Sequence, residues 1–280
     1  RMIEHGPVKS VIRVVSRYGT SKLIQDFAMY PDREQIDVSV TVDWRERSKM
    51  LKLRFPINVK FMKVTYEIPY GYTERFANGE EEPAQSWVDV SGVSRDREVL
   101  YGFSLLNDGK YSVDVNVRDI GLTVLRSPAY AHHIPAALEP DGEYSFIDHG
   151  IQRFRYTILP HLGSWETAGT PRRAVELNQP PVALFTTFHP EGKLAPCDSF
   201  ISVKPENLMV TVLKEAEDGD GLILRAYETS GAAAHAQIQL PALGRIIESD
   251  FGAAEIKTFH IPSDPAQAVT ERNLLEWPDE

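Results

Sequence analysis

The chain has one cysteine, no long apolar run and no excess of basic residues. The single thiol, Cys197, excludes an internal disulfide framework, and we interpret it as a thiol without a function. A chain without disulfides fits a reducing compartment, so we expect a cytoplasmic protein. No window approaches the roughly 20 apolar residues of a membrane helix. Residues 1–10 lack the apolar core of a signal peptide, so we expect none.

The charge balance is acidic. The 280 residues include 30 Lys and Arg against 40 Asp and Glu, a net charge of −10. A nucleic-acid surface needs a basic face, and an anionic membrane attracts basic segments as well. The sequence therefore predicts neither a nucleic-acid partner nor a membrane partner. Its length predicts a large core and two β units.

Helical periodicity is also missing from the first 160 residues. In residues 36–44, Ile36, Val38, Val40 and Val42 alternate with polar residues, which indicates a strand with one buried face. Other runs of strand character lie at 8–18, 22–30, 51–55, 59–67, 87–90, 99–106, 111–117, 121–126 and 153–161. This pattern predicts an all-β fold of antiparallel sheets.

Two long stretches lack a strand pattern. Residues 69–83 are rich in Gly, Asn and Glu and are predicted to form a loop long enough to be functional. Residues 127–150 contain three prolines and are predicted to be irregular. The predicted helix is 170–178, with Pro171 in its first turn and two prolines after its end.

Short strands return after this helix. They are predicted at 182–189, 234–240, 244–248 and 255–261, at the spacing of a β-sandwich. The prolines at 180–181 predict a boundary between one domain at 1–180 and a second at 181–280, although Pro196 is an alternative boundary.

A β-hairpin is predicted within residues 199–231. Its apolar runs 208–213 and 222–227 flank an acidic turn that contains Gly219 and Gly221. The acidic residues of this turn, which are Glu215, Glu217, Asp218 and Asp220, lack the regular spacing of an EF-hand loop. We interpret them as a solvated turn.

Four segments together resemble the C-terminal β-domains of glycoside hydrolase family 38, the α-mannosidases. They are YGFSLLNDGKYSVDV (101–115), LTVLRSPAY (122–130), RFRYTILPHLGSW (153–165) and SVKPENLMVTVLKEAEDGDGLILRAYETSG (202–231), and they follow the family's order. The resemblance implies a β-supersandwich, similar to galactose mutarotase, followed by a small β-sandwich.

The resemblance also implies a supporting function. The family's catalytic aspartates and zinc ligands lie in an N-terminal β/α barrel, and nothing in this chain resembles that barrel. We therefore expect no catalytic residue, metal ligand or cofactor here, with zinc held by the barrel. The expected partners are the barrel of the same polypeptide and a mannose-containing carbohydrate, and the chain alone is expected to be inactive.

Three residues are candidates for contact with substrate. Arg75, in YGYTER, matches a family loop beneath the barrel, where an arginine can reach the active site. Arginine suits such a role because its charged donor fork can bond sugar hydroxyls and carboxylates. The alternative is a surface arginine paired with Glu74 or with one of Glu80–Glu82. Tyr70 and Tyr72 are candidates to stack on a sugar, or else are packing anchors.

Two further functions stay open. A carbohydrate-binding module would use an aromatic platform, with Tyr70, Tyr72 or Trp87 as its members. A mutarotase-like enzyme would need a histidine and a carboxylate across a concave sheet, such as His149 and Glu74. The residues His132, His133, His149 and His161, near Asp148, match no zinc spacing.

Overall fold

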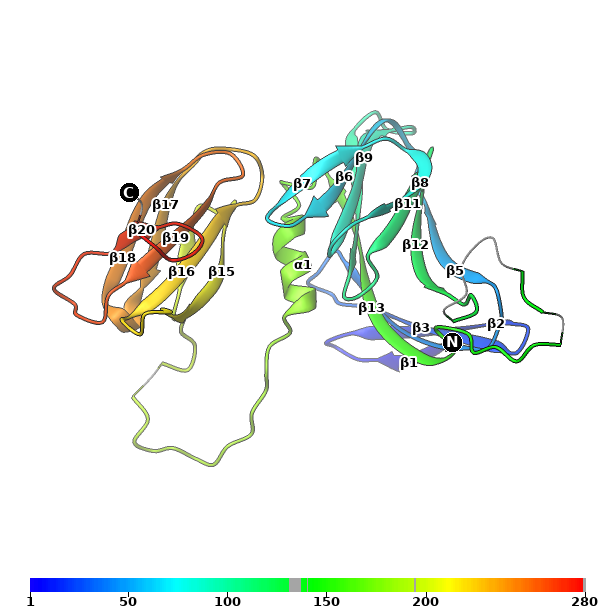
Figure 1. Ribbon diagram of the computed structural model, residues 1–280, viewed down its shortest axis with the longest axis horizontal. Coiled ribbons are helices and arrows are strands. Elements are labelled where there is room, and N and C mark those ends of the chain that lie inside the picture. Colours follow the sequence, from blue (N-terminus) through cyan, green and yellow to red (C-terminus); the bar gives the residue numbers. More distant parts are fainter. Residues whose placement is uncertain (131–136, 140, 194, 279–280) are drawn as a thin grey trace. The chain divides into compact units, whose positions relative to one another are not determined.

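The computed structural model describes residues 1–130, 137–139, 141–193 and 195–278. The chain divides into two compact units, Arg1–Pro180 and Pro181–Glu280 (Figure 1). The regular secondary structure of both is almost entirely β-strand, which confirms the all-β fold class. Within the described residues, no helix is long and apolar enough to cross a membrane.

The first unit contains two sheets of antiparallel strands. The nine-stranded sheet has the order β1-β2-β3-β4-β13-β10-β9-β6-β7, and the four-stranded sheet has the order β5-β12-β11-β8. The strands are β1 (Met2–His5), β2 (Ser10–Tyr18), β3 (Ser21–Met29), β4 (Ile36–Trp44), β5 (Met50–Pro56), β6 (Val59–Ile68), β7 (Gly71–Arg75), β8 (Asn78–Pro83), β9 (Trp87–Ser94), β10 (Leu100–Asn107), β11 (Ser112–Asn116), β12 (Asp119–Arg126) and β13 (Gly150–Leu162).

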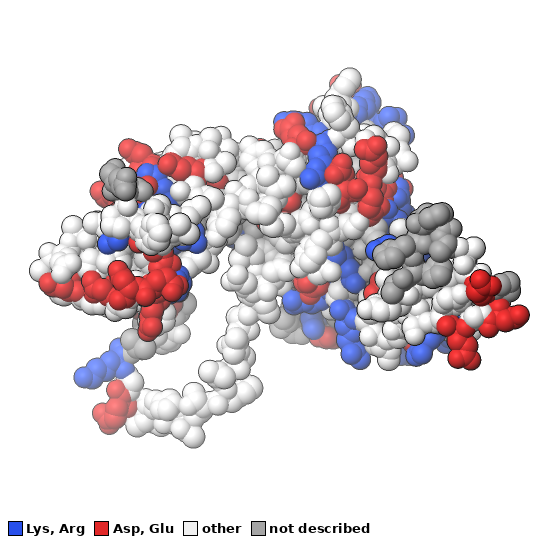
Figure 2. All heavy atoms as spheres, in the orientation of Figure 1, with Lys and Arg blue, Asp and Glu red and all other residues white. Residues whose placement is uncertain are grey.

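One core lies between these two sheets. On β4, Val38, Val40 and Val42 are at most 2% exposed, so the alternation in the sequence marks the buried face correctly. They belong to one apolar cluster with Val113 of β11 and Leu122 of β12, which come from the other sheet. On the face drawn in Figure 2, basic and acidic side chains are interspersed over this unit.

Helix α1 (Thr170–Asn178) packs on the opposite face of the nine-stranded sheet, against β9 and β10. Ala174 of α1 packs in a second apolar cluster with Trp87, Leu106 and Trp165. Helix α1 begins and ends where the sequence predicts, with Pro171 at its start.

Two sequence predictions are wrong. Residues 69–83 are not a loop, because they contain β7, which pairs with β6, and β8, which pairs with β11. Residues 182–189, all of them described, form no strand despite their β-rich composition. Strand formation depends on hydrogen-bonded neighbours, which a local pattern does not specify.

The second unit is a small β-sandwich, in agreement with the prediction. Its sheets have the orders β14-β17-β18 and β15-β16-β19-β20, and residues of both sheets form one apolar core. The strands are β14 (Ser202–Lys204), β15 (Leu208–Glu215), β16 (Leu222–Glu228), β17 (Ala234–Leu240), β18 (Arg245–Phe251), β19 (Ile256–Ile261) and β20 (Thr270–Arg272), with a 3-10 turn at Pro241–Leu243. The predicted hairpin is β15–β16.

Candidate functional site

The β6–β7 hairpin carries all three candidate site residues. Ile68 pairs with Gly71, so Pro69 and Tyr70 form its tip. Tyr70 has a φ of 54°, a conformation that is uncommon for a residue with a side chain, and it is 37% exposed. The hairpin lies at the edge of the nine-stranded sheet, because β7 is the last strand in the order.

Tyr72 faces the side of the sheet that α1 covers. Its ring lies 4.7 Å from that of Trp165, which in turn packs 5.0 Å from Trp87. Trp87 is 1% exposed and therefore cannot serve as a sugar platform. Tyr72 is thus part of an aromatic packing cluster, as the alternative interpretation expects.

Glu67 lies opposite Tyr72 in the hairpin. Its carboxylate accepts hydrogen bonds from the N–H and the hydroxyl of Ser86, both at 2.5 Å. Burial raises the pKa of Glu67, although the Ser86 hydrogen bonds oppose the shift. Since both hydrogen bonds hold Ser86, the residue before β9, to Glu67 of β6, we assign Glu67 a structural role.

Arg75 faces the other side of the sheet, toward the core between the two sheets. Its guanidinium lies 4.8 Å from the ring centroid of Tyr66, a core residue whose pKa burial raises to about 12. Nη1 donates to the carbonyl of Pro83 at 2.5 Å, and Nε lies 3.6 Å from Oε2 of Glu82. Arg75 therefore links β7 of one sheet to β8 of the other. Glu74 pairs instead with Lys63, at 2.5 Å.

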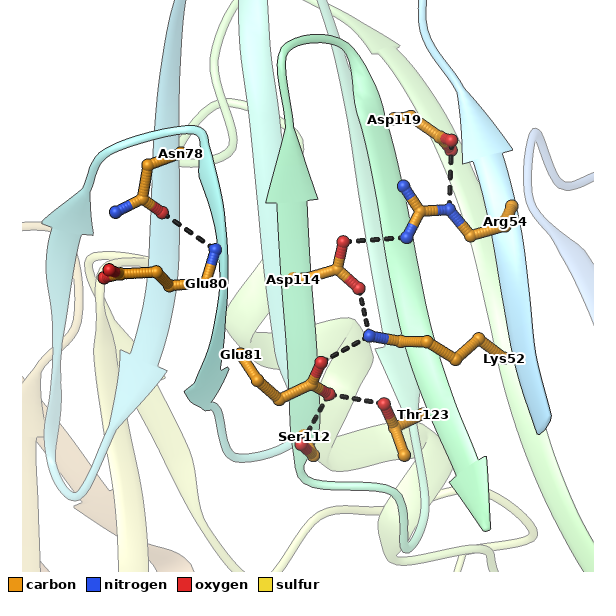
Figure 3. Close-up of polar contacts among 9 residues, drawn as sticks. All are labelled: Lys52, Arg54, Asn78, Glu80, Glu81, Ser112, Asp114, Asp119 and Thr123. Atoms are coloured by element: carbon orange, nitrogen blue, oxygen red, sulfur yellow. Dashed lines mark hydrogen bonds and ion pairs between the residues drawn. The ribbon is translucent and has the colours of Figure 1, made fainter. Parts of the chain in front are cut away.

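A network of charged side chains on the outer face of the four-stranded sheet connects β8 to the other strands of that sheet (Figure 3). Glu81 of β8 pairs with Lys52 and accepts hydrogen bonds from Ser112, at 2.6 Å, and from Thr123. Asp114 pairs with Lys52 and with Arg54, the latter at 2.7 Å, and Asp119 binds Arg54 at 3.0 Å. Each charge in this network faces one of opposite sign, and we therefore assign the network a structural role.

The turn between β7 and β8 presents an exposed aromatic ring. Phe76 follows Arg75 directly and is 89% exposed, and Phe61 is 87% exposed. Val64 pairs with Arg75, so Phe61 and Phe76 both lie beyond this pair, at the same end of the hairpin. Phe61 sits in a register shift of β6 with a φ of 50°, and such a bulge can redirect a side chain.

The mutarotase-like pair does not form. His149 immediately precedes the first residue of β13, and its Nε2 lies 2.9 Å from the carbonyl oxygen of Glu46. Glu74 is on β7, and β10, β9 and β6 lie between these two strands in the sheet order. The geometry therefore supplies no acid–base pair from these residues.

His161 belongs to a buried polar cluster. Its Nε2 lies 2.8 Å from Oδ2 of Asp89, which also accepts a hydrogen bond from Ser104 at 2.7 Å. Oδ1 of Asp89 accepts one from Ser91 at 2.5 Å, and Ser104 contacts Thr170 of α1 at 2.8 Å. Asp89 and Ser104 are 0% exposed, so this cluster positions α1 on the sheet and has no access to a substrate. Sequence reasoning missed it, although an aspartate within the apolar run of β9 was a signal.

The residues described include no group of three His, Cys, Asp or Glu side chains that would hold a metal ion. His132 and His133 lie outside the described residues. In the acidic turn, Asp218 Oδ1 accepts the N–H of Asp220 at 3.1 Å, and Gly219 and Gly221 have φ values of 79° and 80°. These features are typical of a hairpin turn.

Comparison with known proteins identifies the family. The profile "Glycosyl hydrolases family 38 C-terminal domain" matches residues 1–143, and "Glycosyl hydrolases family 38 C-terminal beta sandwich domain" matches residues 207–280. The chain belongs to glycoside hydrolase family 38. The resemblance seen in the sequence is thereby confirmed, and the chain is a C-terminal region of this family.

Relatives of this family 38 chain are much longer proteins. Alpha-mannosidase G of Dictyostelium discoideum is 30% identical over 255 residues, which are 83% of this chain and 21% of that protein. Alpha-mannosidase 2C1 of Homo sapiens is 31% identical over 225 residues, 76% of this chain and 19% of that protein. The chain thus spans about a fifth of the length of these relatives.

The fold is also that of a solved family 38 protein. The crystal structure of an alpha-mannosidase from Enterococcus faecalis V583 matches with a TM-score of 0.73 and 16% sequence identity, over 93% of this chain and 34% of that one. At this identity the match concerns the fold alone. It agrees with the predicted arrangement of a large layered sheet unit and a smaller β-sandwich.

Proposed function

We propose that this chain is the non-catalytic C-terminal part of an α-mannosidase, an enzyme that hydrolyses α-mannosidic bonds. Its partner is an N-terminal catalytic barrel of the same polypeptide, and its role is to support and complete that barrel's active site. The names of the relatives and the fraction of their length that this chain spans support the proposal. The exposed single thiol, Cys197, favours the cytoplasm as its location.

The observation that carries the proposal is the pair of exposed rings beside Arg75. Phe61 and Phe76 are 87% and 89% exposed, at one end of an edge hairpin. Isolated apolar side chains on a surface need no explanation, but two exposed phenyl rings at one end of a hairpin are typical of a contact surface. We therefore assign this end of the hairpin to the contact with the barrel.

A second stretch supports the same role. Residues 182–188 carry four large apolar side chains that are between 84% and 104% exposed: Val182, Leu184, Phe185 and Phe188. A segment of high β propensity that has no strand neighbour is suited to pairing with, or packing against, another part of a longer protein.

Arg75 contributes to the active site chiefly by positioning the β7–β8 turn. Its guanidinium is shared between Pro83, Glu82 and the ring of Tyr66, and its side chain remains 22% exposed. The exposed part can still donate to a sugar hydroxyl, since a guanidinium carries five N–H groups. Tyr70, at the hairpin tip, is better placed to meet a sugar than Tyr72, which packs on Trp165.

Zinc belongs to the barrel in this proposal. The described residues supply no set of three ligands that would fit it, so no step of the reaction is derived through zinc in this chain. The two carboxylates that glycoside hydrolysis requires are assigned to the barrel for the same reason.

The test is hydrolysis of 4-nitrophenyl α-D-mannopyranoside with zinc present. We expect no turnover by this chain alone, and turnover when it is mixed with the separately produced N-terminal part of the same polypeptide. The double variant Phe61→Ser/Phe76→Ser should reduce the restored activity at least about tenfold, because it removes two exposed rings that the contact with the barrel would bury. Ile246→Ser, which removes a 61% exposed side chain from β18, serves as the control.

Two results would count against the proposal. Turnover by this chain alone would show that it holds a catalytic site of its own, above all if Arg75→Ala weakened that turnover. Restored activity that Phe61→Ser/Phe76→Ser leaves at the level of Ile246→Ser would remove the assigned contact surface.

A further inference from the structure

The second unit contains a pocket that neither the fold nor the proposed barrel contact explains. It has a volume of about 350 Å³ and lies between the turn after β15 and the segment that follows β20. Ala216, Ile223 and His260 line it and are at most 7% exposed, so they form its floor. Its size is at the lower end of the ~300–1,000 Å³ typical of small-molecule sites.

Trp277 forms one wall of this pocket and is 65% exposed. The chain has four tryptophans, and the other three, Trp44, Trp87 and Trp165, are at most 5% exposed in the first unit. An exposed indole offers a large flat apolar face together with an N–H donor. Its place in the wall of a pocket makes it available to a ligand with a flat apolar face.

The loop that carries Trp277 is held rigidly. The side-chain oxygen of Asn273 accepts the N–H of Leu275 at 2.9 Å and that of Trp277 at 3.1 Å. The N–H of Asn273 donates to the carbonyl of Trp277 at 3.0 Å, which closes the loop. A loop backbone that is already held in place loses little conformational entropy when a ligand binds.

Glu276 ties this loop to the β15–β16 hairpin. Its carboxylate lies 2.7 Å from Lys214 Nζ and accepts the N–H of Glu217 at 3.1 Å. The hydrogen bond from Lys214 lowers the pKa of Glu276, so the carboxylate is charged at neutral pH. The two sides of the pocket are therefore joined by a fixed ion pair.

Arg272 places hydrogen-bond donors at the pocket. Its Nη2 lies 3.4 Å from Nδ1 of His260, and its Nη1 lies 3.4 Å from the carbonyl of Glu276. His260 donates from Nε2 to the carbonyl of Asp220 at 2.5 Å, so its Nδ1 is the acceptor for Arg272. Both hydrogen bonds of Arg272 are long, at 3.4 Å, so its guanidinium N–H groups can also donate to a ligand.

The charges of the lining select the class of ligand. Three carboxylates, those of Glu217, Asp218 and Glu276, line the pocket and disfavour an anion. Lys214 pairs with two of these carboxylates, those of Glu217 at 2.6 Å and Glu276 at 2.7 Å. Together with the guanidinium of Arg272 it offsets most of the negative charge, so the pocket does not select a cation either. A neutral ligand with hydroxyl groups and one apolar face matches both conditions.

We propose that this pocket binds a neutral pyranose ring of an oligosaccharide. The ring stacks on Trp277, its hydroxyls accept hydrogen bonds from Arg272, and they donate to the carboxylates of Glu217 and Asp218. This site lies wholly in the second unit and does not depend on the proposed barrel contact. The expected Kd for one sugar ring is on the order of millimolar, because the pocket is small and open.

The test is a ¹H–¹⁵N NMR titration of the whole chain. The four indole N–H signals are resolved first, and the signal missing from Trp277→Phe is that of Trp277. Methyl α-D-mannopyranoside or methyl α-D-glucopyranoside should shift this signal to saturation and leave the other three in place. Trp277→Ala, read from the amide signals of residues 272–276, should weaken binding at least about tenfold. Ile246→Ala, an exposed apolar residue on the other sheet, should bind as the unaltered chain does.

Three outcomes would overturn the proposal. The first is an indole signal of Trp277 that neither glycoside moves at its highest soluble concentration. The second is an equal shift with xylitol, an acyclic polyol, because stacking on a ring would then not be involved. The third is a Trp277 signal that depends on protein concentration without sugar, which would assign the ring to contact between copies of the chain. None of these readouts involves hydrolysis. A negative result for sugar binding would therefore leave the proposed support of the catalytic barrel unaffected.

Discussion

Tyr72 and Arg75 lie three residues apart on β7 and face opposite sides of the nine-stranded sheet. Tyr72 packs against Trp165 on the side of α1, whereas Arg75 lies over Tyr66 in the core between the sheets. Strand side chains alternate between faces, so an odd separation sends them apart. The two side chains therefore lie in different surroundings, and in the proposed function Arg75 belongs with the β7–β8 turn and not with Tyr72.

The link that Arg75 makes between the two sheets should be measurable as stability. Arg75→Ala removes the contact with Tyr66 and the hydrogen bond to Pro83, and should lower the free energy of unfolding by about 1–2 kcal/mol. Arg33 lies over Tyr30 at 5.0 Å and is exposed, so Arg33→Ala is a matched control with an expected change below about 0.5 kcal/mol. Urea unfolding followed by circular dichroism measures both. Equal small changes would contradict a structural role for Arg75.

Gly121 leaves the space that the charge network in Figure 3 occupies. A Cβ at this position would lie 2.2 Å from Asp114 Oδ1 and 2.4 Å from Arg54 Nη1. Gly121→Ala should therefore displace this ion pair and lower the free energy of unfolding by about 1–3 kcal/mol. At Gly109 a Cβ would meet no described atom within 4 Å, so Gly109→Ala should be neutral or slightly stabilising. The prediction fails if thermal melting temperatures of the two variants are the same.

The buried cluster around Asp89 should be sensitive to the loss of its charge. Asp89→Asn replaces one acceptor oxygen by an NH₂ group that faces donors from Ser91, Ser104 or His161. We expect a loss of about 2–4 kcal/mol in the free energy of unfolding, since buried donors are left unpaired. Asp32→Asn, at an exposed turn, should change it by less than about 0.5 kcal/mol. Hydrogen exchange of α1 amides should increase in Asp89→Asn alone, and an unchanged α1 would argue against the positioning role.

Glu228 should make the stability of the second unit depend on pH. Burial opposes its ionisation, but hydrogen bonds from the Ser230 hydroxyl and the Ala254 N–H more than compensate and lower the pKa of Glu228. A lowered folded-state pKa contributes stability above the unfolded value of about 4.5, and this contribution is lost as pH falls through the folded value. Glu228→Gln should cost about 2–3 kcal/mol at pH 7, with the difference from the unaltered chain shrinking below about pH 4.5.

The control for this pH dependence is Glu206→Gln, which alters an exposed carboxylate near the same loop. Its unfolding curve should follow that of the unaltered chain from pH 7 to pH 3. Chemical unfolding monitored by the amide signals of residues 201–278 separates this unit from the first. A constant difference between Glu228→Gln and the unaltered chain at every pH would contradict a contribution from ionisation.

The sequence by itself determined the elements whose pattern is local. The alternation from Ile36 to Trp44 predicts β4 with its bounds, and Pro171 with the prolines after Asn178 predicts helix α1. The family is also readable from the sequence, because four segments occur together and in order. These features depend on side-chain period and on proline geometry, which act over a few neighbouring residues.

The tertiary structure alone decided which strands exist at the edges and which polar groups meet. Residues 71–75 and 78–83 are strands because β6 and β11 lie beside them, whereas the β-rich residues 182–189 have no such neighbour among the described strands. Asp89 and His161 are 72 positions apart and meet only because β9 and β13 both pair with β10. Hydrogen-bonded neighbours and burial arise from contacts between distant segments, and for that reason a local pattern does not specify them.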